Sequence, residues 1–116
     1  MAHQRLGIAQ YMEADYEEAV KSLQNSLQIN DRNAITHHNI GLAYTAIQLY
    51  GFAVRHFLLA IECDKHHFES YISLGNVYIE RNEYHLAGTT FKSILRIDKT
   101  YEGAMRALEH LDTLLI

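Results

Sequence analysis

The chain has no proline and no tryptophan, and Cys63 is the only cysteine among its 116 residues. One cysteine excludes a disulfide within the chain, so we expect a reducing compartment, the cytoplasm. Ten Lys and Arg against fourteen Asp and Glu give a net charge of -4. Because binding to phosphates needs a basic surface, we expect no nucleic acid partner. No apolar run approaches about 18 residues, so we expect no membrane insertion, and the first residues, "MAHQRLGIAQY", lack the pattern of a signal peptide.

A repeat of 34 residues runs through the chain and is marked by Gly7, Gly41 and Gly75. Five further columns keep the same step, each with one residue type or close relatives: Leu6, Ile40 and Leu74; Tyr16, Tyr50 and Tyr84; Ala19, Ala53 and Ala87; Leu23, Phe57 and Phe91; Leu27, Ile61 and Leu95. Repeats of this length are typical of solenoids and related arrays.

The residue pattern within each repeat predicts two helices. Apolar residues at Ile40, Ala43, Tyr44 and Ile47 follow helical spacing. The segments between units, "NDRN" and "DKHH", are polar and contain Asn or Asp, as turns do. The spacing therefore predicts seven helices, at 2–13, 16–29, 34–47, 50–63, 68–81, 84–97 and 101–115.

These columns resemble the tetratricopeptide repeat family: a Leu or Ile before the glycine, a tyrosine opening each second helix, an alanine three residues later, and a Phe or Leu four residues after that. The resemblance implies an all-α fold, a right-handed α-solenoid of helix-turn-helix repeats. It also implies a single domain over 1–116, with repeats at 1–33, 34–67 and 68–101 and a capping helix at 102–116. The chain departs from the family in lacking a proline between repeats, where Asp31, Lys65 and Lys99 stand.

The glycine of each repeat stands inside a predicted helix, where it costs roughly 1 kcal/mol relative to alanine. We expect Gly41 to face the second helix of its own repeat near Ala53. Two small residues let the backbones approach closely, so that the larger Tyr50 and Phe57 interlock around them.

The residues that carry chemistry do not form a catalytic or metal-binding pattern. Adjacent histidines point about 100° apart on a helix, so neither "HH" pair can chelate as two histidines four residues apart would. The loop from Cys63 to His67 holds four candidate ligands, but Cys63 shares an apolar column with Ile29 and Ile97, so we expect it to be buried. No phosphate-binding glycine loop or nucleophile motif is present. We therefore expect no metal site, no cofactor and no enzymatic activity.

The resemblance implies a protein-binding scaffold or adaptor, whose first helices line a concave groove that takes a peptide or a helix of a partner. The predicted groove residues are Gln4, Ile8, Tyr11, His38, Asn39, Leu42, Glu69, Ile72, Ser73, Asn76 and Ile79. The apolar members would bury ligand side chains, and Asn39 and Asn76 would pair with a peptide backbone. Alternatively, the isoleucines pack against neighbouring first helices and the asparagines are ordinary surface residues.

A second function stays open, that of a self-assembly module forming homo-oligomers by repeat stacking or helix exchange. The apolar end of the chain, Leu114–Ile116, favours it. The sequence also leaves open whether the chain is a piece of a longer array.

One subgroup of the family grips the acidic C-terminal tails of chaperones with lysines, asparagines and an arginine. In register, its positions fall on Gln4, Ile8, Asn39, Glu69 and Ser73. Only Asn39 matches, and Glu69 places a negative charge where a carboxylate needs a cation. We therefore expect no binding of such tails.

Overall fold

The computed structural model describes residues 18, 21 and 33–116, and every regular element in that part of the chain is a helix. The helices are α2 (Ala34–Ala46), α3 (Tyr50–Cys63), α4 (Phe68–Glu80), α5 (Tyr84–Ile97) and α6 (Glu102–Leu115). Their bounds agree with the predicted ones to within one residue, which confirms the all-α solenoid. The described part thus holds five helices, not seven, because the two helices predicted in repeat 1 lie outside it, except for Glu18 and Lys21, which are helical.

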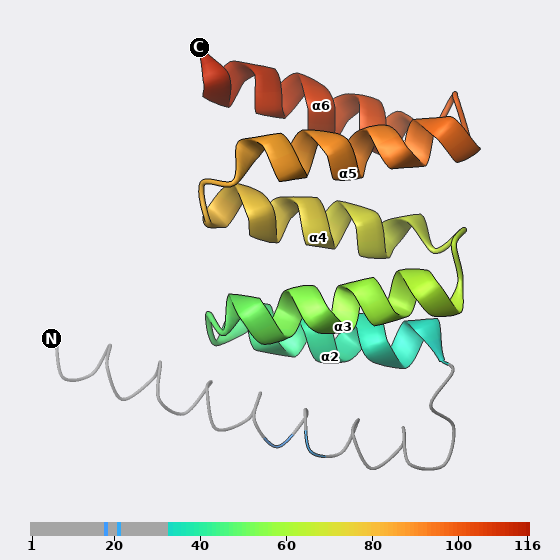
Figure 1. Cartoon of the computed structure of the whole chain (residues 1–116), viewed down its shortest axis with the longest axis vertical. Helices are drawn as coiled ribbons and strands as arrows, with labels where there is room; N and C mark the ends of the chain where they lie inside the picture. The colour runs from blue at the N-terminus through green and yellow to red at the C-terminus, as the bar shows by residue number, and fades with distance from the viewer. Residues whose placement is uncertain (1–17, 19–20, 22–32) are drawn as a thin grey trace, which may run out of the picture.

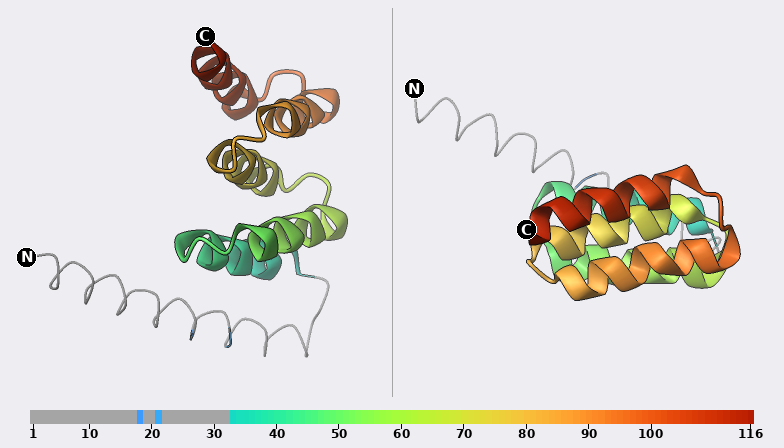
Figure 2. Two further views of the ribbon diagram at one scale, coloured as in Figure 1. Left: turned by 60° about the vertical axis from the view of Figure 1, so that its left-hand side comes forward. Right: turned by 90° about the horizontal axis from the view of Figure 1, so that it is seen from above.

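The helices stack along the long axis of the molecule (Figure 1). Seen from above, α2, α4 and α6 form one layer and α3 and α5 form the other (Figure 2). Within the first layer α2 contacts α4 and α4 contacts α6, whereas α3 and α5 do not touch each other. The closer spacing of α2, α4 and α6 makes this layer the inner side of the curved stack.

Asparagine and aspartate side chains shape the turns where the family places proline. The Asn33 side chain caps α2 by accepting a hydrogen bond from the backbone N–H of Thr36, 3.2 Å away. Between repeats, Asp64 Oδ1 accepts from the N–H of His66 at 2.9 Å, and Asp98 Oδ1 accepts from the N–H of Thr100 at 3.0 Å. Asp64 and Asp98 are 34 residues apart, so the same short-range bond closes both turns.

The core runs between the two layers, and the glycine column lies at its centre. Phe57 and Phe91 are fully buried, and each ring lies against the glycine of its own repeat, Gly41 or Gly75. The expectation that the glycine faces the second helix is therefore confirmed, with the phenylalanine ring as its nearest neighbour. The end of the stack is formed by α6, which packs on α5 and α4.

The prediction that Cys63 is buried is wrong, because this cysteine is exposed. It is the last residue of α3, and Ile97, its counterpart at the end of α5, is also exposed, to 42%. The last position of α3 and the last position of α5 are both exposed to solvent. The column is therefore apolar in sequence but does not belong to the core.

No helix in the described part of the chain is both long enough and apolar enough to cross a membrane.

Candidate functional site

The inner layer presents a strip of exposed side chains along α2 and α4. Asn39 and Leu42 on α2 are exposed, and Asn76 on α4 is exposed as well. Leu42 keeps 43% of its surface accessible, although it is a large apolar residue on a helix that packs on two others. We call this strip, together with Glu69 on α4, the inner strip. It offers an apolar contact flanked by two amides, each able to donate and to accept hydrogen bonds.

His38 and Ser73, two of the predicted groove residues, are joined to each other in the structure. His38 is buried, and its Nε2 atom lies 2.9 Å from Ser73 Oγ, a hydrogen bond that joins α2 to α4. The His38 ring also packs against those of Phe57 and His67, with centroids 5.5 and 5.2 Å away. Both polar groups are already engaged within the protein, so they hold the inner layer together beneath the inner strip.

The two predicted isoleucines of α4 also pack inside the molecule to a large extent. Ile72 and Ile79 are half-buried against a cluster formed by Ala87, Phe91 and Leu111. Ala87 and Phe91 lie on α5, the second helix of the same repeat, and Leu111 lies on α6, so these isoleucines pack mainly within the repeat and against the last helix. The other predicted residues, Gln4, Ile8 and Tyr11, lie outside the described residues.

Charge on the inner strip is negative. The helix α2 carries no Asp, Glu, Lys or Arg, and α4 carries Glu69 and Glu80, both exposed and with no basic residue on the same helix. On α6, Arg106 lies 3.5 Å from Glu102 in an exposed ion pair. A ligand along α2 and α4 therefore meets two carboxylates and no lysine or arginine of those two helices.

Three potential metal ligands meet at the edge of the inner strip, to which Glu69 itself belongs, and the sequence did not predict this cluster. His38, His67 and Glu69 each offer one ligand atom, and these atoms lie within 4.8 Å of one another. Burial lowers the pKa of His38, His67 lowers it further, and Glu69 opposes the shift. The residues come from α2 and from the start of α4, so no local spacing marks them. Only the 34-residue register, which sets α2 beside α4, could have brought them together.

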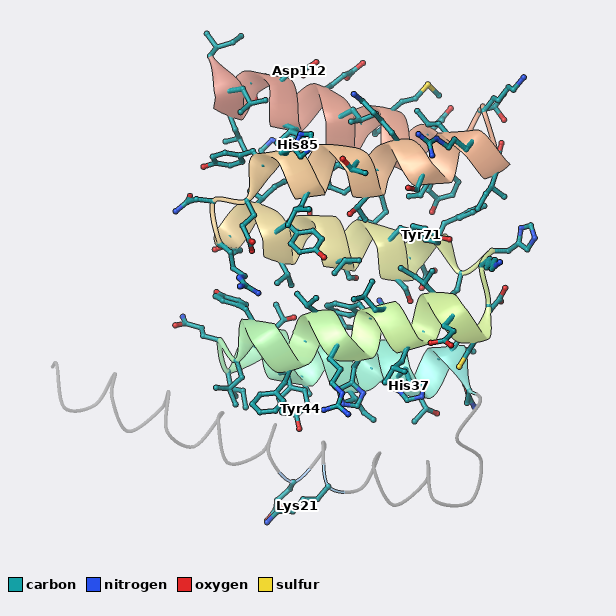
Figure 3. All side chains as sticks on the ribbon, in the orientation of Figure 1. Lys21, His37, Tyr44, Tyr71, His85 and Asp112 are labelled. Atoms are coloured by element: carbon teal, nitrogen blue, oxygen red, sulfur yellow. The ribbon has the colours of Figure 1, made fainter. Side chains whose placement is uncertain are left out.

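A second histidine cluster lies on the face of the α2–α3 pair that points away from α4, where Figure 3 labels His37 and Tyr44. The Nδ1 atoms of His37 and His56 are 3.3 Å apart, and their rings stack. The rings of Tyr44 and Phe52 continue the stack, with centroids 5.3 Å apart. Burial, His37 and then Arg55 lower the pKa of His56 to about 4.

Residues 68–101 match the family model described as tetratricopeptide repeat. These are the residues of the predicted third repeat. Among characterised relatives, the human serine/threonine-protein phosphatase 5 is 28% identical over 83 residues, which cover 72% of this chain. The match spans only 17% of the length of that phosphatase.

Two solved structures share the fold. The TPR domain of Arabidopsis OM64 superposes with a TM-score of 0.76 at 21% identity, covering 92% of this chain and 88% of that one. The second TPR domain of human RPAP3, solved in complex with the HSP70 peptide SGPTIEEVD, gives a TM-score of 0.75 at 21% identity, covering 94% of this chain and 91% of that one.

Proposed function

Because this chain is a tetratricopeptide repeat protein, we propose that it is a scaffold or adaptor that binds a segment of a partner protein along its inner strip. The observation that carries the proposal is the exposure of Asn39, Leu42 and Asn76 on two helices that contact each other. The peptide complex of the RPAP3 domain supports it, since that domain shares the fold. The single cysteine favours the cytoplasm as the place of action.

The partner segment is neutral or basic. The exposed carboxylates of Glu69 and Glu80 repel an acidic peptide, and α2 and α4 carry no Lys or Arg to offset them. Side-chain amides such as those of Asn39 and Asn76 suit the alternating N–H and C=O groups of an extended backbone. An apolar ligand side chain completes the contact by covering Leu42.

A peptide array of mixed charge, followed by fluorescence anisotropy on the peptides retained, tests this proposal. The Asn39→Ala and Asn76→Ala variants should each weaken binding by about 0.5–1.5 kcal/mol, the value of one lost hydrogen bond. His85→Ala is the matched control, because His85 is exposed on α5 in the other layer (Figure 3). Unchanged affinity in the double asparagine variant, or an equal loss in the His85 variant, would place the binding surface elsewhere.

Self-association is the second candidate function, favoured by apolar side chains exposed on α6. Met105 is 40% exposed, Leu114 43% and Leu115 58%. Burying such a surface against another copy removes apolar area from water, which drives association. Sedimentation velocity over a wide concentration range tests it, and a monomer at the highest concentration contradicts it.

A further inference from the structure

We propose that His38, His67 and Glu69 bind a divalent transition-metal ion of the zinc class between α2 and the start of α4. One ligand atom from each residue lies within 4.8 Å of the other two. Two imidazoles and one carboxylate are a ligand set that zinc accepts, with a fourth position left for water. The site shares Glu69 with the inner strip but uses neither Asn39, Leu42 nor Asn76, so zinc binding can be tested without a peptide.

Each of the two imidazoles is held by a serine hydroxyl. His38 Nε2 lies 2.9 Å from Ser73 Oγ, and His67 Nδ1 lies 2.6 Å from Ser70 Oγ. When the serine oxygen accepts the ring N–H, the other nitrogen of that ring carries the lone pair that a metal ion needs. Such an outer hydrogen bond fixes both the tautomer and the orientation of a ligating histidine.

The charges of the site also suit a cation. Neither α2 nor α4 carries a Lys or Arg whose charge would repel the ion. Glu69 lies in the first turn of α4, and its carboxylate offsets the positive end of the helix dipole.

The ligand atoms need only a small movement to reach coordination distance. Zinc bonds of about 2.0–2.2 Å in a tetrahedron place the ligand atoms about 3.3–3.6 Å from one another. The three atoms now lie within 4.8 Å of one another, so no separation must shorten by more than about 1.5 Å. Glu69 is exposed, so its side chain can rotate towards the two imidazoles while these keep their serine hydrogen bonds.

The test uses the full chain, stripped with a chelator and titrated with ZnCl2 by calorimetry. We expect one zinc ion to bind per chain at this site, with an increase in melting temperature because the ion links α2 to α4. Glu69→Gln removes a ligand at an exposed position, so it leaves the fold intact, and His67→Ala removes a second. Each should weaken zinc binding by about 10-fold or more.

The chain has eight histidines, so the controls must separate this site from others. His66→Ala removes the exposed neighbour of His67, and His56→Gln disrupts the His37–His56 pair on the opposite face. Both control variants should keep the wild-type affinity, and bound Co2+ should show tetrahedral visible absorption that Glu69→Gln abolishes. The proposal is overturned if zinc does not bind, if Glu69→Gln and His67→Ala bind as the wild type does, or if a control variant accounts for the loss.

Discussion

The ring of Phe57 lies directly over Gly41, so that a Cβ atom added to this glycine would stand 2.5 Å from Phe57 Cε1. The ring cannot turn aside, because Phe57 is fully buried among Ala53, Leu74 and Val77. Glycine has a lower helix propensity than alanine, so Gly41 weakens α2 locally. In return, the missing side chain allows close contact between α2 and α3.

Gly41→Ala should therefore destabilise the protein although alanine is the better helix former. The gain of about 1 kcal/mol in propensity is outweighed by overpacking at the upper end of the usual range of about 1–3 kcal/mol. Gly51→Ala is the matched control, since a Cβ there meets nothing within 4 Å. It should raise the free energy of unfolding by up to about 1 kcal/mol. Urea denaturation measures both, and changes of the same sign would contradict the account of Gly41.

The alanine column should be equally intolerant of large side chains. Ala53 and Ala87 are fully buried, so Ala53→Leu or Ala87→Leu must push apart helices that are already close-packed. Each should cost about 1–3 kcal/mol. Ala46→Leu, at an exposed site on α2, is the control. Thermal melts that are unchanged for both buried variants would count against the repeat register.

Gln48 and Asn82 occupy the turn inside their repeats, 34 residues apart, and both have a left-handed backbone with φ of 64° and 61°. Asparagine tolerates this conformation and glutamine does not, since left-handed backbone costs most residues roughly 1–2 kcal/mol. Gln48→Asn should therefore stabilise the protein by about 0.5–1 kcal/mol, a part of that cost. Asn82→Gln should destabilise it, also because Asn82 Oδ1 accepts a hydrogen bond from the Tyr84 hydroxyl at 3.0 Å. Chemical denaturation of the two variants should show opposite shifts in midpoint.

Stability should fall on acidification because of His56. Its pKa is about 4 in the folded protein, mainly through burial, against 6.5 for an ordinary histidine. Between these values the unfolded chain binds more protons, so stability rises with pH. The contribution of neutral His56 is complete above about pH 6.5 and is lost as the pH falls towards 4.

Melting temperatures at pH 7.5 and pH 5 measure this loss. His56→Gln should reduce the difference between the two temperatures, whereas His85→Gln, at an exposed site on α5, should not. If the melting temperature falls by the same amount from pH 7.5 to pH 5 in the wild type and in the His56 variant, the pH dependence comes from other groups.

Peptides with the acidic C-terminal tail of chaperones should not bind. Asn39 is the single match to the clamp of that subgroup. In the structure Glu69 is exposed with its negative charge, and Ser73 Oγ is engaged by His38. Calorimetry with such a peptide should show no heat of binding, with the second TPR domain of human RPAP3 as the positive control, since it was solved with an HSP70 peptide. Micromolar affinity that is lost when the terminal carboxylate is amidated would contradict this prediction.

The bounds of the helices could be predicted to within one residue because the same residue pattern occurs three times, and each copy predicts the same pair of helices. A column such as Ala53 and Ala87 identifies a packed position more safely than any single residue does, and the structure buries both fully. Cys63 shows where this reasoning fails. Its column is apolar in sequence. Burial of the last residue of a helix depends, however, on whether a neighbouring element covers it, and the periodicity of the sequence does not show this.

The site was harder to predict because its details depend on side chains from different repeats. Helical spacing put His38 on the inner face, but the hydrogen bond to Ser73 that draws it beneath the surface comes from α4. The approach of His67 and Glu69 to His38 depends on the same packing of α2 on α4. Asn39 and Asn76, whose placement relies on helical phase alone, are both exposed, and their role as groove residues stays a prediction.

The helix α4 contacts each of the other four described helices, whereas α6 contacts only α5 and α4. Opening of the structure should therefore be graded along the chain. Release of α6 breaks its two interfaces and leaves the packing among α2, α3, α4 and α5 in place. Release of α4 breaks four of the six helix–helix interfaces of the described part and leaves only the α2–α3 and α5–α6 pairs. Amide hydrogens of α6 should exchange with solvent through this local fraying, and those of α4 only through global unfolding. The half of the inner strip on α4 would then be among the last parts of the molecule to lose its shape.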